Sequence, residues 1–206
     1  TSDLLANTGG VEITLGKEMI RTPVDDAIGY IKKTVIGDVM NIKKVRVDKE
    51  GTGMGWGAVY AQYLESMDQI GEQGNGLSVS RQLYKGDEAL NESAPLKVGD
   101  KITVRLTVKA DRDMDFVQIK DDRAACMEPL QAVSGFRWSN GLGYYQATKD
   151  ASTQFFIDQM RKGTYVIEYQ VYVNRTGEYQ AGIATVQSAY APEFGGHTGG
   201  YRVMVE

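Results

Sequence analysis

Strict alternation of apolar and polar residues is the feature that most limits what this chain can fold into. Residues 102–109 alternate without a slip, and residues 165–173 place apolar side chains at every second position. Successive side chains on a β-strand point to opposite faces, so each segment predicts a strand with one face in a core and one in water. The pattern favours antiparallel strands over helices.

Further segments with the same character recur along the whole chain. Turn signals separate them, among them Gly74-Asn75-Gly76 and Ser139-Asn140-Gly141. Short strands at this spacing, with almost no helical period, are typical of an antiparallel β-sandwich, so we predict an all-β fold. The additional strands are predicted at residues 11–15, 30–36, 42–47, 56–63, 77–83, 116–119, 155–157, 179–187 and 201–205.

The length of 206 residues favours two β modules over one, because a single sandwich needs about 100 residues. The polar, Gly-rich stretch at residues 68–76 indicates the boundary. We therefore expect a partial antiparallel β module at residues 1–74 and a complete sandwich at residues 75–206. Residues 128–153 are predicted to form a long irregular insert, and loops of that length are usually functional.

Charge and composition exclude several function classes. The formal net charge of −4 has the wrong sign for binding nucleic acid. No apolar run is long enough to span a bilayer. Cys126 is the one cysteine and His197 the one histidine, so no internal disulfide and no two-histidine metal site can form. His197 lies in a Gly-rich stretch with nothing obvious to orient it, and we predict neither an enzyme nor a cofactor.

Aromatic residues in the predicted insert are candidates for a contact surface. Phe136, Trp138, Tyr144 and Tyr145 could stack on sugars or bind a protein partner. The alternative is that these rings pack the insert against its own sandwich.

An acidic cluster is a weak candidate for a calcium site. Asp111, Asp113 and Asp115 alternate and would share one face of an extended strand. A helix-loop-helix calcium loop also needs Gly at its sixth position, where this chain has Phe116. The alternative is a solvated turn in which Arg112 and Arg123 balance the charge.

Several motifs in the second half resemble one family. They are Gly-Thr-Tyr-Val-Ile-Glu-Tyr at residues 163–169, Asn-Arg-Thr-Gly-Glu-Tyr at 174–179 and Ala-Tyr-Ala-Pro-Glu-Phe at 189–194. Residues 117–129 and 56–63 also match, although Arg123 stands where the family has Pro. Together these segments resemble the C-terminal region of bacterial α2-macroglobulin-like proteins.

The resemblance implies a fragment of a longer protein. It would hold the end of the β domain that brackets the helical thioester domain, followed by the terminal macroglobulin-like, receptor-binding-like sandwich. Whole members are protease traps of the bacterial cell envelope, in the periplasm or at the cell surface. A bait region is cut, the molecule rearranges and, in thioester-bearing members, the protease is captured covalently.

Within that family the fragment would be non-catalytic. Cys126-Met127-Glu128-Pro129 has Pro where the thioester motif Cys-x-Glu-Gln needs its acyl-donating Gln. We expect a module that packs against and reports on the helical domain, with the other domains of its parent as partners and target proteases met through the whole parent. The alternative is a cell-surface module that binds carbohydrate or protein.

Overall fold

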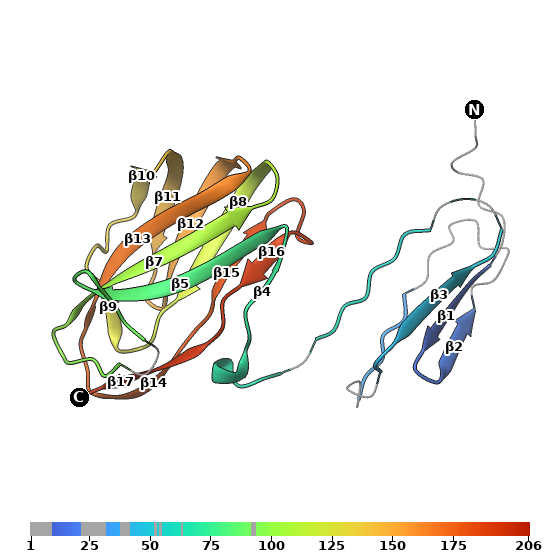
Figure 1. The fold of residues 1–206 in the computed structure, drawn as a ribbon, viewed down its shortest axis with the longest axis horizontal. Helices are drawn as coiled ribbons and strands as arrows, with labels where there is room; N and C mark the ends of the chain where they lie inside the picture. The colour runs from blue at the N-terminus through green and yellow to red at the C-terminus, as the bar shows by residue number, and fades with distance from the viewer. Residues whose placement is uncertain are drawn as a thin grey trace. The chain divides into compact units, whose positions relative to one another are not determined.

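The computed structural model describes residues 10–21, 32–37, 42–51, 53, 55–62, 64–91 and 94–206. The chain forms two compact units, Thr1–Gln62 and Tyr63–Glu206. Strands dominate both units (Figure 1), and the one described helix is the single 3-10 turn η1, Met67–Gln69. Within the described residues, no helix is long and apolar enough to cross a membrane. The predicted all-β fold is confirmed.

The first unit contains a three-stranded antiparallel sheet. Its strands are β1 (Val11–Leu15), β2 (Glu18–Arg21) and β3 (Val45–Lys49), in the order β2-β1-β3. Ile13 lies opposite Ile20 on one side and Val47 on the other. None of the unit's described residues is fully buried.

Several strand predictions in the first unit differ from the structure. The strand at residues 11–15 is confirmed, β3 lies slightly later than predicted, and β2 was not predicted. The prediction at 56–63 is wrong over residues 56–62, which are exposed and form no strand, and residue 63 lies outside the described part. The prediction at 30–36 is wrong over 32–36, and residues 30 and 31 are not described.

The second unit contains the remaining strands. They are β4 (Gln73–Asn75), β5 (Leu77–Lys85), β6 (Glu88–Ala89), β7 (Lys101–Ala110), β8 (Met114–Asp122), β9 (Met127–Pro129), β10 (Gly135–Ser139), β11 (Leu142–Thr148), β12 (Ser152–Met160), β13 (Gly163–Val173), β14 (Gly177–Ala181), β15 (Ala184–Ser188), β16 (Gly195–His197) and β17 (Tyr201–Val205).

These strands form a sandwich whose two layers are joined along one side. One layer runs in the order β10-β11-β12-β8-β15, and the other in the order β5-β7-β13-β9. Strands β16 and β4 connect β15 to β5, and β14 pairs separately with β17. Figure 1 shows β5, β7 and β13 in front of β8, β11 and β12. All pairings between named strands are antiparallel, as expected for a macroglobulin-like sandwich.

The core lies between the layers, where the alternating patterns predicted it. On β7 the apolar side chains at residues 102, 104, 106 and 108 are buried, and those of 167, 169, 171 and 173 on β13 lie beside them. From the other layer, Val117, Ile119, Phe155 and Ile157 complete the cluster. Removing such side chains from water is the main favourable contribution to the fold.

Glycines let the sheet fold over where the layers join. Gly196 on β16 lies opposite Gly74 on β4. A Cβ on Gly196 would stand 2.7 Å from the Leu77 carbonyl oxygen, and a Cβ on Gly74 would stand equally close to the same atom. The Gly-rich stretch at 68–76 is therefore partly strand. The predicted boundary after residue 74 falls inside β4, which belongs to the second unit.

The irregular insert predicted at residues 128–153 is wrong, because most of it is strand. It holds β10, β11 and the connection between them. Asn140 and Gly141 form a two-residue turn, both with positive φ, which matches the type I′ hairpin that Asn-Gly favours. The predicted strand at 179–187 is two strands, β14 and β15. It breaks at Gly182, where a Cβ would lie 2.4 Å from the Asp122 Cβ.

Candidate interaction surface

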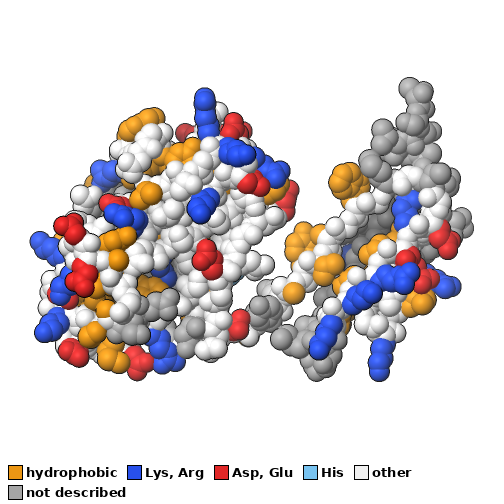
Figure 2. Space-filling view, in the orientation of Figure 1, with side chains coloured by type: hydrophobic (Ala, Val, Ile, Leu, Met, Phe, Trp, Pro, Cys, Tyr) orange, Lys and Arg blue, Asp and Glu red, His pale blue; other side chains and the backbone are white. Residues whose placement is uncertain are grey.

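The β10–β11 hairpin presents large aromatic side chains to solvent. Phe136 is 79% exposed and Trp138 is 78% exposed, on the same face of β10. Figure 2 shows hydrophobic side chains at the surface of the end of the second unit where β10 and β11 lie. Because burying such rings elsewhere would stabilise the fold, their exposure indicates a contact surface.

The exposed rings continue across three strands. Phe136 lies opposite Tyr145 on β11, with ring centroids 5.1 Å apart in an edge-to-face arrangement. Tyr145 in turn lies opposite Phe156 on β12, which is also exposed. We call Phe136, Trp138, Tyr145 and Phe156 the aromatic patch. Phe156 was not predicted, because in the pair Phe155-Phe156 the sequence does not tell which ring faces the core.

Tyr144 does not belong to this surface, contrary to the prediction. It is 6% exposed and packs edge to face against the core ring of Phe155, with the two ring centroids 5.6 Å apart. The reason is strand alternation, since Tyr144 and Tyr145 are neighbours on β11 and must point to opposite faces. Burial raises the pKa of the Tyr144 hydroxyl.

Gly143 leaves room for the Trp138 ring. The two residues are opposite each other, and a Cβ on Gly143 would stand 2.8 Å from the Trp138 ring. The ring therefore lies close against Gly143, while most of the side chain is exposed to solvent.

Arg137 lies between Phe136 and Trp138 and points to the opposite face of β10. It pairs in register with Tyr144. Its Nη2 donates to the Gln131 side-chain oxygen and the Val133 carbonyl, both at 3.4 Å, and it forms no ion pair with any carboxylate in the described part of the chain. Arg137 thus carries a positive charge without a local counter-charge at the outer edge of the sheet.

A second exposed aromatic pair lies away from the hairpin. Phe116 on β8 and Tyr190 contact each other edge to face at 5.1 Å, and both are exposed. Phe116 has a φ of 53°, which is unfavourable for a bulky residue. The Ala189 amide donates to the Phe116 carbonyl and holds this conformation in place.

Two of the acidic candidates already interact with protein groups. Asp111 forms an ion pair with Arg112 at 2.8 Å, which lowers the pKa of Asp111. Asp113 accepts a hydrogen bond from the Lys162 amide at 2.7 Å, so it points toward the turn before β13. No group of three metal-ligating side chains occurs among the described residues. Asp111, Asp113 and Asp115 remain separate polar positions rather than a formed cation site.

Arg123 has a different role from the one predicted. It is buried, so it cannot balance the acidic cluster at the surface. Its Nη1 donates to the Thr153 hydroxyl at 2.7 Å, and its Nη2 donates to the carbonyls of Lys149 and Asp150. Arg123 therefore fastens the turn between β11 and β12, and its Nε has no partner in the described structure.

Cys126 and His197 both lie within the packed second unit. Burial raises the pKa of the Cys126 thiol, so the reactive thiolate is disfavoured. The Nδ1 of His197 lies 3.1 Å from the Thr198 carbonyl, and His197 itself is a strand residue paired with Gln73. The Gly-rich stretch thus places His197 in strand β16, where it is half-buried.

A buried polar network was not predicted. Arg81 on β5 forms an ion pair with Asp121 on β8, and Tyr169 on β13 donates a hydrogen bond to the same carboxylate at 2.7 Å. Arg81 also donates a hydrogen bond to the Gly182 carbonyl. Its guanidinium carbon lies 4.5 Å from the centroid of the Tyr201 ring. Each of these residues lies on or beside a strand in which apolar and polar residues alternate in the ordinary way. The sequence spacing between them therefore does not indicate that they meet in the fold.

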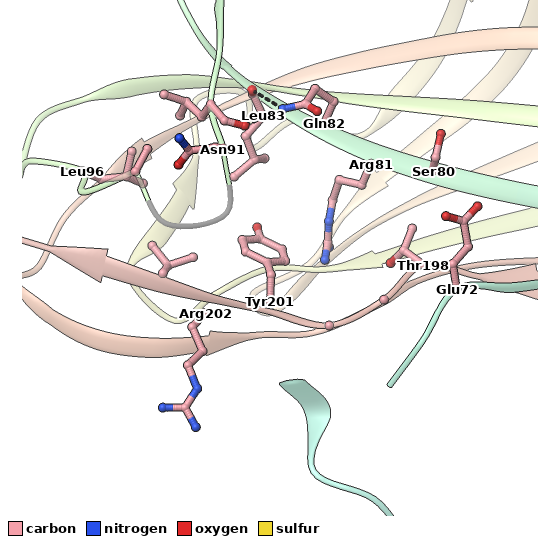
Figure 3. Close-up of a pocket in the computed structure, with 15 residues that line it drawn as sticks. Glu72, Ser80, Arg81, Gln82, Leu83, Asn91, Leu96, Thr198, Tyr201 and Arg202 are labelled. Carbon is pink, nitrogen blue, oxygen red and sulfur yellow. Dashed lines mark hydrogen bonds between the residues drawn. The ribbon is translucent and has the colours of Figure 1, made fainter. Parts of the chain in front are cut away.

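A pocket of about 380 Å³ opens beside this network, between β5 and the start of β17. Figure 3 shows the Tyr201 hydroxyl and the Arg81 side chain pointing into it, while Arg202 points away. Burial raises the pKa of Tyr201 to about 12, so its hydroxyl is a neutral donor at physiological pH. Leu83, Leu90 and Leu96 supply apolar lining.

The second unit is thus an all-β sandwich that carries an exposed aromatic patch. Residues 76–193 match the family described as the bacterial α2-macroglobulin MG10 domain. That range covers more than half of the chain, and the chain belongs to this family.

Solved structures of bacterial α2-macroglobulins share the fold. Salmonella α2-macroglobulin reacted with methylamine is 17% identical with a TM-score of 0.54, over 97% of this chain and 13% of that one. Native Escherichia coli α2-macroglobulin from domain MG7 to the C-terminus is 13% identical with a TM-score of 0.55, over 98% of this chain and 34% of that one. This chain therefore spans a minor part of each.

A curated protein also matches. It is "Circularly permutated Ras protein 2" of Dictyostelium discoideum, 28% identical over 166 residues, which is 77% of this chain and 4% of that protein. The match covers too little of that protein to carry its function over to this chain.

Proposed function

We propose that this chain is a non-catalytic part of a bacterial α2-macroglobulin-like protease trap. The observation that carries the proposal is that the residues matching the MG10 family, 76–193, fall within the sandwich of the second unit. Similar structures include Escherichia coli α2-macroglobulin activated by porcine elastase and by trypsin. In the longer protein the sandwich would pack against neighbouring domains and report bait cleavage to them.

The aromatic patch is the proposed contact surface for that role. Its rings lie in register across β10, β11 and β12 on an outer face of the sandwich. Exposed aromatic residues of this kind dominate the binding energy of many protein interfaces. The partner would be another domain of the parent, and target proteases would be met through the parent as a whole.

The non-catalytic assignment is tested with the 206-residue chain itself. We expect no hydrolysis of peptide, ester or glycoside substrates above the buffer rate. Glu128, which accepts a hydrogen bond from Asn174 at 3.3 Å, is a suitable reporter carboxylate. Hydrolysis that disappears in Glu128→Gln would contradict the assignment. We also propose a location in the bacterial cell envelope, which fractionation of the producing cell would test.

A cell-surface carbohydrate-binding module is the second candidate. The observation that favours it is the Trp138 side chain, which lies close against Gly143 and is largely exposed, since a sugar ring could stack on an exposed indole. This candidate predicts glycan binding that is lost in Trp138→Ala. A glycan array without binding would remove it.

A further inference from the structure

Strand β10 is an edge strand whose outer side is unpaired. In the described structure it is the last strand of its layer and pairs with β11. No residue of β10 forms a backbone hydrogen bond on its other side within the described structure. Edge strands are commonly protected by Lys, Pro, a bulge, an inward-pointing charge or a covering segment. Residues 135–139, Gly-Phe-Arg-Trp-Ser, contain neither Lys nor Pro, and Arg137 is their one charge.

The side chains of β10 define which strand could pair with it. Phe136 and Trp138 point to the face of the aromatic patch, and Arg137 points to the other face. In an added antiparallel strand, the residues opposite Phe136 and Trp138 would need to be apolar. The residue between them would face Arg137, which has no carboxylate partner in the described residues.

Charge argues against a second copy of this chain as the occupant. Pairing β10 with itself about Arg137 would place two guanidinium groups directly opposite each other, and like charges in that position are destabilising. A carboxylate opposite Arg137 would instead form a charge-assisted hydrogen bond. Complementarity therefore favours an acidic residue at the centre of the partner strand.

We infer that β10 is a docking edge for an extended polypeptide segment with an apolar–acidic–apolar pattern. Backbone hydrogen bonds to β10 would supply affinity, and the side chains on the two faces would supply selectivity. The inference deepens the contact role proposed for the aromatic patch and rests on it.

The probe is the synthetic peptide Lys-Thr-Val-Glu-Val-Thr-Lys, titrated into the 206-residue chain. Trp56→Phe serves as the background, so that Trp138 is the one fluorescent indole. We expect saturable binding, weakened about fivefold by Glu→Gln in the peptide and equally by Arg137→Gln in the chain. Arg137→Glu should abolish binding of the Glu peptide and restore binding of the Glu→Lys peptide to within about threefold.

Two measurements separate strand pairing from other modes. Alternate N–H groups of an added strand point toward and away from β10. N-methylation of one alternate set of peptide amides should therefore lose binding by at least tenfold, while methylation of the other set should leave it. The double variant Phe136→Ser with Trp138→Ser has no indole, so its binding is measured by isothermal titration calorimetry. It should lose at least tenfold in affinity, and Phe116→Ser, which lies outside the patch, is the matched control.

Four results would overturn the inference, and the first three concern the peptide. They are affinity that ignores both N-methylation sets, failure of charge reversal to restore binding in variants whose circular dichroism matches wild type, and binding of a chito-oligosaccharide but not of the peptide. Dimerisation in sedimentation velocity that competes with the peptide would also overturn it in favour of a second copy. Protease capture by the longer protein is a separate readout, so its failure would reject the proposed function and not the binding edge.

Discussion

Gly196 is a position where a single methyl group should damage the sandwich, because the atoms nearest to it are all backbone atoms. A Cβ there would stand 2.7 Å from the Leu77 carbonyl oxygen, 2.8 Å from the Gln73 carbonyl oxygen and 3.0 Å from the Gly74 Cα. All three are backbone atoms of β4 or β5, so no side chain can rotate away. Relaxing the first contact to an ordinary 3.4 Å needs a strand movement of 3.4 − 2.7 = 0.7 Å.

Such a movement opens the corner that joins the two layers. We expect Gly196→Ala to lower the free energy of unfolding by about 2–3 kcal/mol, the usual cost of overpacking a closed site. Urea unfolding followed by far-UV circular dichroism measures the change. Gly135→Ala is the matched control, because a Cβ at Gly135 meets nothing within 4 Å. We expect the control to stay within about 0.5 kcal/mol of wild type. Equal stability of the two variants would refute the close-approach argument.

Three further predictions concern buried or paired groups. Cys126 should react with Ellman's reagent only after unfolding, because the thiol is buried and burial raises its pKa. If Cys126 in the folded protein reacted as fast as an exposed free thiol, the prediction would be contradicted. Burial raises the pKa of Tyr201 to about 12, so its contribution to the free energy of unfolding is complete below about pH 10 and is lost as the pH rises toward 12. Between about pH 10 and 12 the free energy of unfolding should therefore fall less in Tyr201→Phe than in wild type. The Lys85 ion pair and the Lys97 amide lower the pKa of Asp100. The free energy of unfolding of wild type should therefore exceed that of Asp100→Asn above about pH 4, and this difference should shrink as the pH falls. A constant difference down to about pH 2 would contradict the prediction.

The long central strands could be predicted from sequence because their alternation is uninterrupted. Val104 and Leu106 on β7 face the core as predicted, and the Asn140–Gly141 turn was recognised as a turn. The hairpin around that turn was missed, because β10 and β11 are short and their aromatic residues suit either an exposed loop or a strand. Tyr144 and Tyr145 differ in exposure only because strand register places them on opposite faces.

The buried network could not have been predicted from one sequence. Arg81 and Asp121 are 40 positions apart and meet because β5 and β8 lie in opposite layers near the joined side. Nothing in the local pattern distinguishes Asp121 from the neighbouring Asp122, which is only half-buried and pairs with Lys120. From the sequence alone, a glycine such as Gly196 indicates a loop. Its role in a strand depends on how closely two backbones approach, and that is a property of the tertiary fold.

The most direct test of the proposed function uses the longer protein with and without residues 63–206. Each form is incubated with trypsin, and residual activity is measured on a protein substrate and on a small chromogenic peptide. A protease trap that depends on this domain predicts that the intact form suppresses cleavage of the protein substrate and spares the small peptide, while the truncated form suppresses neither. Equal suppression by both forms, or suppression by neither, would contradict the proposal.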